Sequence, residues 1–175
     1  LLGRIEGHGL HYVTTALADE DVDIRCVAIR MARRLGMTPS VTCATAAEDP
    51  SPAVRRELAV ALRFDDSPTM PSVWARLAQQ YDGKDRWYLE ALGLASDLRA
   101  AECYDAWLEA IDGHWDTPSG RDIVWRIRAP KAAEALVEII SDPSLTLEQT
   151  NRYFRSLEYH SPEVRNEAMK KLLTL

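Results

Sequence analysis

The stretch DPSPAVRRELAVALR, Asp49 to Arg63, decides the fold expected of this chain. A later stretch, SPEVRNEAMKKL, Ser161 to Leu172, repeats the order Ser-Pro-x-Val-Arg-x-Glu. In the first stretch Val54, Leu58 and Leu62 recur every fourth residue, which places them on one face of a helix with 3.6 residues per turn. Each stretch therefore predicts an amphipathic helix whose apolar face needs a neighbour.

Further arginines extend this recurrence along the chain. Arg25 precedes Arg55 by thirty residues and Arg86 follows it by thirty-one, while Arg165 lies in the second stretch. Prolines suited to a first helical turn and glycines suited to a helix end divide the chain into helical segments, and no stretch alternates like a strand. The expected helices span residues 10–18, 21–35, 39–47, 51–63, 69–81, 84–96, 98–111, 119–128, 130–141, 146–159 and 162–174.

The expected architecture follows from these helices and their connections. Connections of two to six residues favour antiparallel neighbours, and helical hairpins that cannot bury their apolar stripes alone stack into a solenoid. We therefore expect an all-α, right-handed superhelix of about five hairpins plus a terminal half, forming a single domain over residues 1–175. Because the chain does not begin with Met, it is expected to be a piece of a longer multidomain protein.

The segment DPSPAVRRELAVAL resembles the second helix of HEAT repeats, with the pattern D-x-x-x-x-V-R-x-x-A-x-x-A-L. The resemblance implies a HEAT-like or ARM-type solenoid in which an acidic residue and an arginine form a ladder between adjacent repeats. Such an acid near a helix N-terminus is favoured by the helix dipole and accepts charge-assisted hydrogen bonds. The implied ladder residues are Asp49 on the acidic side and Arg25, Arg55, Arg86 and Arg165 on the basic side.

A narrower resemblance concerns residues 85–88, DRWY, and 120–126, GRDIVWR. These runs are similar to the HEAT region of large haem-binding, dehydrogenase-like proteins from planctomycete-type bacteria, which join a propeller, a HEAT region and a c-type cytochrome segment. The resemblance implies a periplasmic or exported parent protein in which this chain is a connecting scaffold. The sequence contains no C-x-x-C-H motif, so no haem or other cofactor is assigned to it.

Composition limits the possible partners. Hydrophobic residues make up 46% of the chain and charged residues 27%, as in globular proteins, and no apolar run is long enough for a membrane span. The net charge of −6 disfavours nucleic acid, because duplex binding normally needs a basic surface. Cys26, Cys43 and Cys103 are widely spaced, and we expect them to be small buried residues rather than metal ligands.

Aromatic and basic residues gather between positions 84 and 128, where the repeat is least regular. One interpretation is a groove of rings and guanidinium groups suited to a peptide, a carboxylate or a stacked ring. The alternative is that the tryptophans fill gaps between unequal helices and that the arginines pair with nearby aspartates. The residues predicted to contact a partner are Arg86, Trp87, Arg121 and Trp125.

No catalytic or metal-binding motif accompanies this cluster. His8 and His11 form an H-x-x-H pair without an obvious third ligand, and a Gly-flanked nucleophile and a Gly-rich phosphate loop are both lacking. The expected function is thus a non-catalytic scaffold that binds a protein or another domain of its parent chain. The alternative is a HEAT-like enzyme of the alkylpurine DNA glycosylase type, which would need a continuous basic strip on its concave face. The Trp–Asp pairs suited to that alternative are Trp125 with Asp122 and Trp87 with Asp85.

Overall fold

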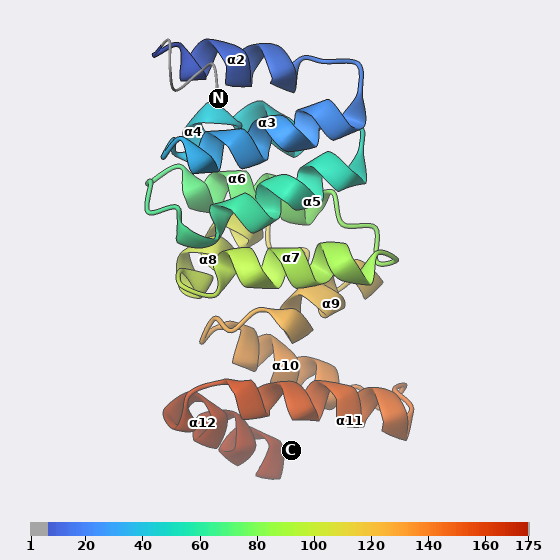
Figure 1. Ribbon diagram of the computed structural model, residues 1–175. Helices are drawn as coiled ribbons and strands as arrows, with labels where there is room; N and C mark the ends of the chain where they lie inside the picture. The colour runs from blue at the N-terminus through green and yellow to red at the C-terminus, as the bar shows by residue number, and fades with distance from the viewer. Residues whose placement is uncertain (1–6, 175) are drawn as a thin grey trace.

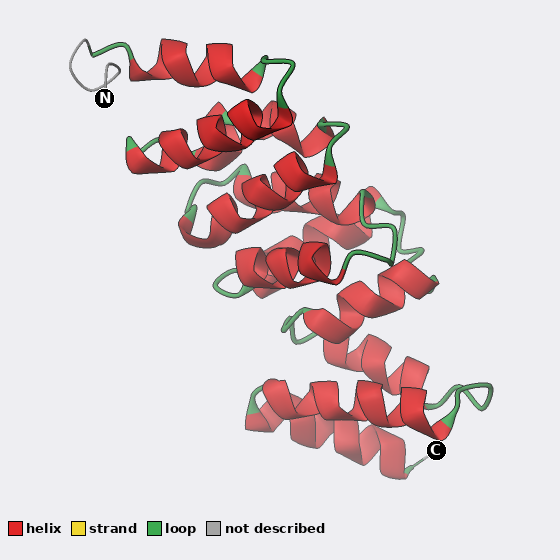
Figure 2. Cartoon of the chain, turned by 45° about the vertical axis from the view of Figure 1, so that its right-hand side comes forward, coloured by secondary structure: helices red, strands yellow, loops and turns green. Residues whose placement is uncertain are grey.

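Helices account for every regular element of the computed structural model, which describes residues 7–174 (Figure 2). The expectation of an all-α chain is confirmed, and each expected span overlaps one of the observed α-helices. The α-helices are α2 Gly9–Leu17, α3 Val22–Arg34, α4 Pro39–Thr42, α5 Pro52–Ala61, α6 Met70–Gln79, α7 Arg86–Ser96, α8 Ala100–Ala110, α9 Pro118–Arg126, α10 Ala132–Ile140, α11 Leu147–Ser156 and α12 Pro162–Leu173. Three segments are 3-10 helices: η1 Ala44–Glu48, η2 Leu62–Phe64 and η3 Leu157–Tyr159.

The helix ends follow local chemistry that the sequence displays. Pro52 and Pro162 lie in the first turns of α5 and α12, where a missing N–H leaves no hydrogen bond unmade. Thr146 and Gln149 form the expected capping box at the start of α11. The single α-helix expected over residues 39–47 is not observed as one element. The α-helix α4 ends at Thr42, and the chain continues as the 3-10 helix η1. None of the helices within residues 7–174 is long and apolar enough to cross a membrane.

The helices lie in two rows that run the length of the molecule, with the two ends of the chain at opposite ends of the stack (Figure 1). In row one, α2 packs against α3, α3 against α5, α5 against α7, α7 against α9, and α9 against α11. In row two, α6 packs against α4, η1 and α8, and α10 packs against α12. Consecutive helices from α3 onward therefore alternate between the rows.

The core lies between the two rows. Trp74 of α6 and Tyr88 of α7 are almost completely buried, and both direct their polar atoms to backbone carbonyls. The indole N–H of Trp74 donates to Leu92 O over 2.8 Å, and the hydroxyl of Tyr88 donates to Leu77 O over 2.9 Å. A buried polar atom without a hydrogen-bond partner is costly, and here both atoms find their partners in the opposite row. These hydrogen bonds therefore join row two to row one.

All three cysteines are buried and free, as expected from their spacing. Burial raises the pKa of Cys43 to about 11 and that of Cys103 to about 12. The Sγ atom of Cys103 lies 3.7 Å from the Sδ atom of Met70, which links α8 to α6. These side chains therefore act as small apolar core residues.

Two of the arginines predicted to form a ladder, Arg25 and Arg55, contact Asp49. Arg25 of α3 donates two hydrogen bonds to the Asp49 carboxylate, over 2.7 and 2.9 Å. The same carboxylate accepts from Ser51 N at 2.8 Å, and Arg55 of α5 donates to Asp49 O at 2.6 Å. Asp49 thus connects α3 with the start of α5. Burial opposes ionisation of Asp49, but the hydrogen bonds from Arg25 and Ser51 outweigh it and lower the pKa of the carboxyl.

Arg25 and Arg55, which contact Asp49, each stand four residues after the N-cap of their helix. Spacing along the chain, which groups Arg86 with them, is therefore the wrong criterion for this position. Arg25 follows N-cap Asp21 by four residues, whereas Arg86 directly follows its N-cap Asp85. The fourth residue after Asp85 is Leu89, so Arg86 does not occupy a ladder position.

Arg121 and Arg165 do stand at the fourth position, after Thr117 and Ser161. The side chain of Arg165 forms no ion pair with any residue between 7 and 174. Its helix α12 packs against α10 in row two, whereas the helix of Arg55, which carries the same motif, belongs to row one. The repeated Ser-Pro-x-Val-Arg-x-Glu motif therefore occurs on two helices in different rows. Arg165 does not make the contact with an acidic residue that the resemblance implies.

Candidate binding groove

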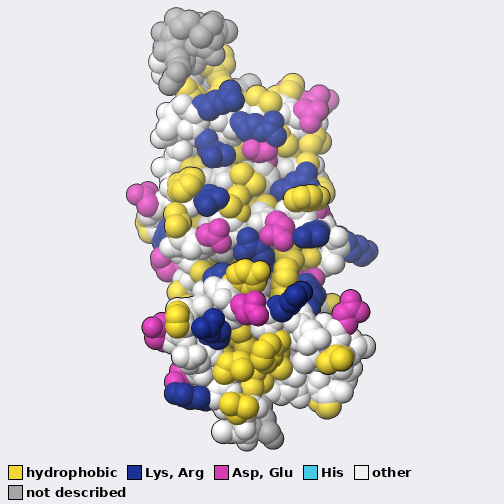
Figure 3. Space-filling model, turned by 60° about the horizontal axis from the view of Figure 1, so that its bottom comes forward, with side chains coloured by type: hydrophobic (Ala, Val, Ile, Leu, Met, Phe, Trp, Pro, Cys, Tyr) yellow, Lys and Arg dark blue, Asp and Glu magenta, His cyan; other side chains and the backbone are white. Residues whose placement is uncertain are grey.

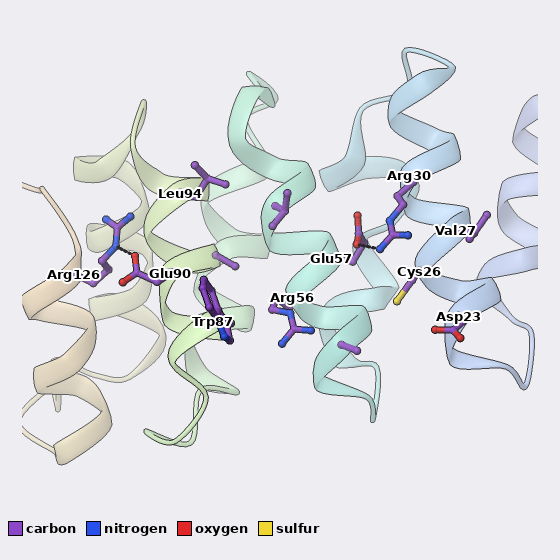
Figure 4. Close-up of a pocket in the computed structure, with 13 residues that line it drawn as sticks. Asp23, Cys26, Val27, Arg30, Arg56, Glu57, Trp87, Glu90, Leu94 and Arg126 are labelled. Carbon is purple, nitrogen blue, oxygen red and sulfur yellow. Dashed lines mark hydrogen bonds and ion pairs between the residues drawn. The ribbon is translucent and has the colours of Figure 1, made fainter.

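A groove of about 760 Å³ crosses three successive helices of row one, α3, α5 and α7. Each of these helices contributes the residues that stand two, five, six and nine positions after its N-cap. The α9 end is bounded by Arg126, nine positions after N-cap Thr117. The lining residues are Asp23, Cys26, Val27 and Arg30 of α3, Ala53, Arg56, Glu57 and Val60 of α5, Trp87, Glu90, Ala91 and Leu94 of α7, and Arg126 (Figure 4).

Apolar side chains of all three helices line the groove. Val27 of α3 is 52% exposed and Trp87 of α7 is 71% exposed, so both present apolar area to solvent. Val60 and Leu94 hold the ninth position after the N-caps of α5 and α7. Exposed aromatic and aliphatic area gathered in one hollow is typical of a surface that contacts another molecule.

The three arginines of the groove are each neutralised by a carboxylate. Each pair joins neighbouring helices of row one, and Figure 4 shows two of them spanning the space between the ribbons. The pairs are Arg30 with Glu57 at 2.7 Å, Arg56 with Asp85 at 3.2 Å, and Arg126 with Glu90 at 2.9 Å. With its charges paired in this way, the groove offers few free guanidinium groups to an anionic ligand.

The α9 end of the groove depends on a glycine of α7. A Cβ atom on Gly93 would overlap the guanidinium of Arg126, so glycine there lets Arg126 lie directly on the backbone of α7. Asp97 lies 3.9 Å from the same guanidinium. Arg126 thereby fastens α9 to α7 and closes this end of the groove.

The structure separates the four predicted contact residues. Trp87 lines the groove, and its neighbour Arg86 is exposed and forms no ion pair within residues 7–174. Trp125 lies outside the groove and lines a depression of about 1240 Å³ along α11. Arg121 also lies outside the groove. The four residues therefore do not line one groove.

Trp125 occupies the junction between α9 and α11. Its indole N–H donates to Arg152 O over 3.1 Å, and the guanidinium of Arg152 lies 4.6 Å from the centre of its ring. This cation–π contact and the hydrogen bond both come from α11. The arrangement is the gap-filling one considered as an alternative for the tryptophans.

Arg121 is held between two carboxylates. It pairs with Asp116 before α9 and, over 3.1 Å, with Asp142 before α11. The hydrogen bond from Arg121 to Asp116 is the main reason that the pKa of the guanidinium is raised, and Asp142 adds to it. Ser144 N donates to the Asp142 carboxylate over 2.9 Å, just as Ser51 N donates to Asp49. Arg121 is therefore a second rung of the ladder.

The aspartates proposed for a glycosylase-like site are already engaged. Asp85 caps α7 by accepting from Trp87 N at 2.9 Å, in addition to its pair with Arg56. Asp122 pairs with Arg152 at 2.6 Å and accepts from the Tyr81 hydroxyl at 3.2 Å. On the face seen in Figure 3, acidic, basic and apolar side chains are interspersed, without an unbroken basic strip.

Residues 7–174 contain no group of three His, Cys, Asp or Glu side chains placed to hold a metal ion.

The sequence does not predict most of the residues that line the groove, including Cys26, Arg30 and Glu57. Comparison of the three helices by distance from the N-cap would have found these residues, because equivalent positions on stacked helices share a face. Compared with protein-family models, with curated proteins and with solved structures, the chain has no significant match.

Proposed function

We propose that this chain is a HEAT-like, right-handed solenoid that acts as a non-catalytic scaffold and binds another protein, or another domain of its parent chain, in the α3–α5–α7 groove. Two features support the solenoid. The helices alternate between two rows along one direction (Figure 1), and Arg25–Asp49 and Arg121–Asp142 form equivalent contacts at separate places in the stack. Such arrays present long continuous surfaces to partners.

One observation carries the binding role. Four equivalent positions on each of three successive helices line one groove, and an aromatic side chain that is 71% exposed, Trp87, lies within it. Tryptophan is enriched among the residues that dominate protein–protein interfaces. An unpartnered tryptophan in a partly apolar hollow is therefore well suited to an anchor contact.

The electrostatics of the groove favour a protein over a nucleic acid. Arg30, Arg56 and Arg126 are each paired with a carboxylate, and phosphate contacts would require these pairs to be broken. The net charge of −6 acts in the same direction. The similarity of residues 85–88 and 120–126 to haem-binding proteins, and with it an exported location, stays a prediction.

A photo-crosslinking experiment tests the binding role. A benzophenone amino acid replaces Trp87, and the matched control carries it at Glu109, an exposed residue of α8 outside the groove. We expect crosslinking at position 87 to one discrete protein segment. An excess of the unlabelled chain should compete for it, and the Trp87→Ala chain should compete poorly. Equal yields at the two positions, or a diffuse set of products, would contradict the proposal.

A further inference from the structure

The groove has one charged lining residue that forms no ion pair. Asp23 of α3 is exposed and forms no ion pair with any residue in the described range, whereas the lining residues Glu57 and Glu90 are paired with arginines. Figure 4 shows Asp23 at one end of the groove and Arg126 at the opposite end. The groove therefore has an exposed carboxylate that is open to an ion pair at its α3 end.

The dimensions of the groove fit an α-helix. Its lining positions extend from the second to the ninth residue after each N-cap, which is about 10 Å along a helix that rises 1.5 Å per residue. A docked α-helix, with its side chains, has a diameter of about 10 to 12 Å. The groove is therefore about as wide as one helix.

The length of the groove sets the length of the docked segment. Packed helices lie about 8 to 10 Å apart, so crossing from α3 to α7 covers about 20 Å, which corresponds to about 13 residues of helix. Apolar side chains face this path at Val27, Val60 and Leu94. An amphipathic helix of three to four turns would cover these side chains with one apolar stripe.

We propose that the partner segment is an amphipathic α-helix of about 13 residues, laid across α3, α5 and α7, with a Lys or Arg over Asp23. The inference rests on the proposed function, that the groove binds protein, and specifies the chemistry of the partner. The apolar stripe covers Val27, Val60, Leu94 and Trp87, and the basic side chain supplies the ion-pair partner that Asp23 lacks. An acidic residue at that end would be repelled, so Asp23 acts as a specificity determinant.

Synthetic peptides test this inference. Three 14-residue helical peptides share a leucine stripe with i, i+3, i+4, i+7 spacing and carry Lys, Gln or Glu at both ends. A fourth peptide has a central proline that breaks the helix. Binding to the complete chain is measured by titration calorimetry, and circular dichroism confirms that each protein variant keeps its helicity.

The expected preference among the peptides comes from one exposed ion pair, between a peptide lysine and Asp23. We expect the Lys peptide to bind about three to five times more tightly than the Gln peptide and the Glu peptide to bind more weakly than both. Asp23→Asn should abolish the preference, and Asp23→Lys should reverse it. Trp87→Ala should weaken all three peptides, and the proline peptide should not bind.

Failure of this inference can be told apart from failure of the proposed function. Trp87-dependent binding without a charge preference, or equal binding of the proline peptide, overturns the inference and leaves the groove as a protein-binding surface. If no helical peptide binds while crosslinking at position 87 stays specific, the partner is not such a helix. If both peptide binding and specific crosslinking are absent, both proposals are wrong.

Discussion

Arg121 donates a hydrogen bond to Asp142 over 3.1 Å, and in this way α9 is joined to the turn before α11. Arg25 makes the equivalent contact with Asp49 between α3 and α5. In both places the aspartate is followed by Pro-Ser, and the serine N–H donates back to the aspartate. A rung of this ladder therefore consists of an arginine and a turn that fixes the carboxylate in place.

The first prediction contrasts two arginines of the candidate set. Arg121→Ala should lower the free energy of unfolding by about 1 to 2 kcal/mol, because two carboxylates lose a charged partner. Arg86→Ala should change it by less than about 0.5 kcal/mol, because Arg86 is exposed and unpaired. Urea denaturation followed by circular dichroism measures both variants. Equal losses would mean that Arg121 is not a structural rung.

The second prediction concerns the Arg25–Asp49 rung. Asp49→Ala should cost about 2 kcal/mol of stability, because it leaves the guanidinium of Arg25 largely buried without a counter-charge. The double variant Arg25→Leu/Asp49→Leu should recover a substantial part of that loss, since no unpaired charge remains. Strictly additive effects in this double-mutant cycle, again by urea denaturation, would show that the two side chains do not interact.

The third prediction separates the two tryptophans. Trp125→Ala should lower stability by about 2 kcal/mol, because it removes a hydrogen bond, a cation–π contact and packing between α9 and α11. Trp87→Ala should stay within about 0.5 kcal/mol, because its ring is exposed. Thermal unfolding monitored by circular dichroism supplies the comparison. A destabilised Trp87→Ala chain would argue that this ring belongs to the core.

The fourth prediction concerns Gly120 in the first turn of α9. A Cβ atom there would overlap the backbone carbonyl oxygen of Trp115, and a backbone atom yields less readily than the end of a side chain. Gly120→Ala should therefore cost about 3 kcal/mol, even though alanine is the better helix former. The control is Ser119→Ala in the same turn, for which we expect little change. A neutral or stabilising Gly120→Ala would mean that the turn before α9 can move away.

The fifth prediction is a pH dependence that comes from His160, between η3 and α12. Its side chain is 7% exposed, and neither ring nitrogen has a hydrogen-bond partner in the described structure. Burial, together with the nearby positive charge of Arg128, lowers the pKa of His160 to about 4. The unfolded chain takes up this proton near its ordinary pKa of about 6.5, so protons favour the unfolded state.

The free energy of unfolding is therefore unaffected by this proton above about pH 6.5. It decreases as the pH falls from there toward 4, because the unfolded state binds the proton and the folded state does not. The total loss should be about 3 kcal/mol, since each unit of pKa difference corresponds to about 1.4 kcal/mol. Urea denaturation at a series of pH values, compared between the native chain and His160→Phe, isolates this contribution. A pH profile that is the same for both chains would contradict the prediction.

The helices were predictable because their signals are local. Apolar residues at intervals of three and four, prolines in first turns and the Thr146–Gln149 box depend only on neighbours in the chain, and each of the predicted segments overlaps a helix of the structure. The sequence does not predict the break between α4 and η1, because 3-10 turns commonly continue the end of an α-helix and differ from it by one residue in hydrogen-bond spacing.

The candidate site was less predictable. The sequence predicts contacts to a partner for Trp87, Arg121 and Trp125 on the same grounds. Trp87 lines the groove, but Arg121 pairs with Asp142 and Trp125 packs against Arg152. A tryptophan or an arginine looks the same in sequence whether its partner is a neighbouring helix or another molecule. Only the positions of residues distant in the chain distinguish the two.

The sequence by itself determined that this chain is helical and where most of its helices begin and end, because helix formation depends on contacts between residues a turn apart. Tertiary structure alone decided which row each helix joined. It thereby separated Arg165 in α12 from Arg55 in α5, although the two share a motif, and it aligned Asp23, Trp87 and Arg126 along one groove. Those relationships depend on the packing of whole helices against each other, which no local spacing specifies.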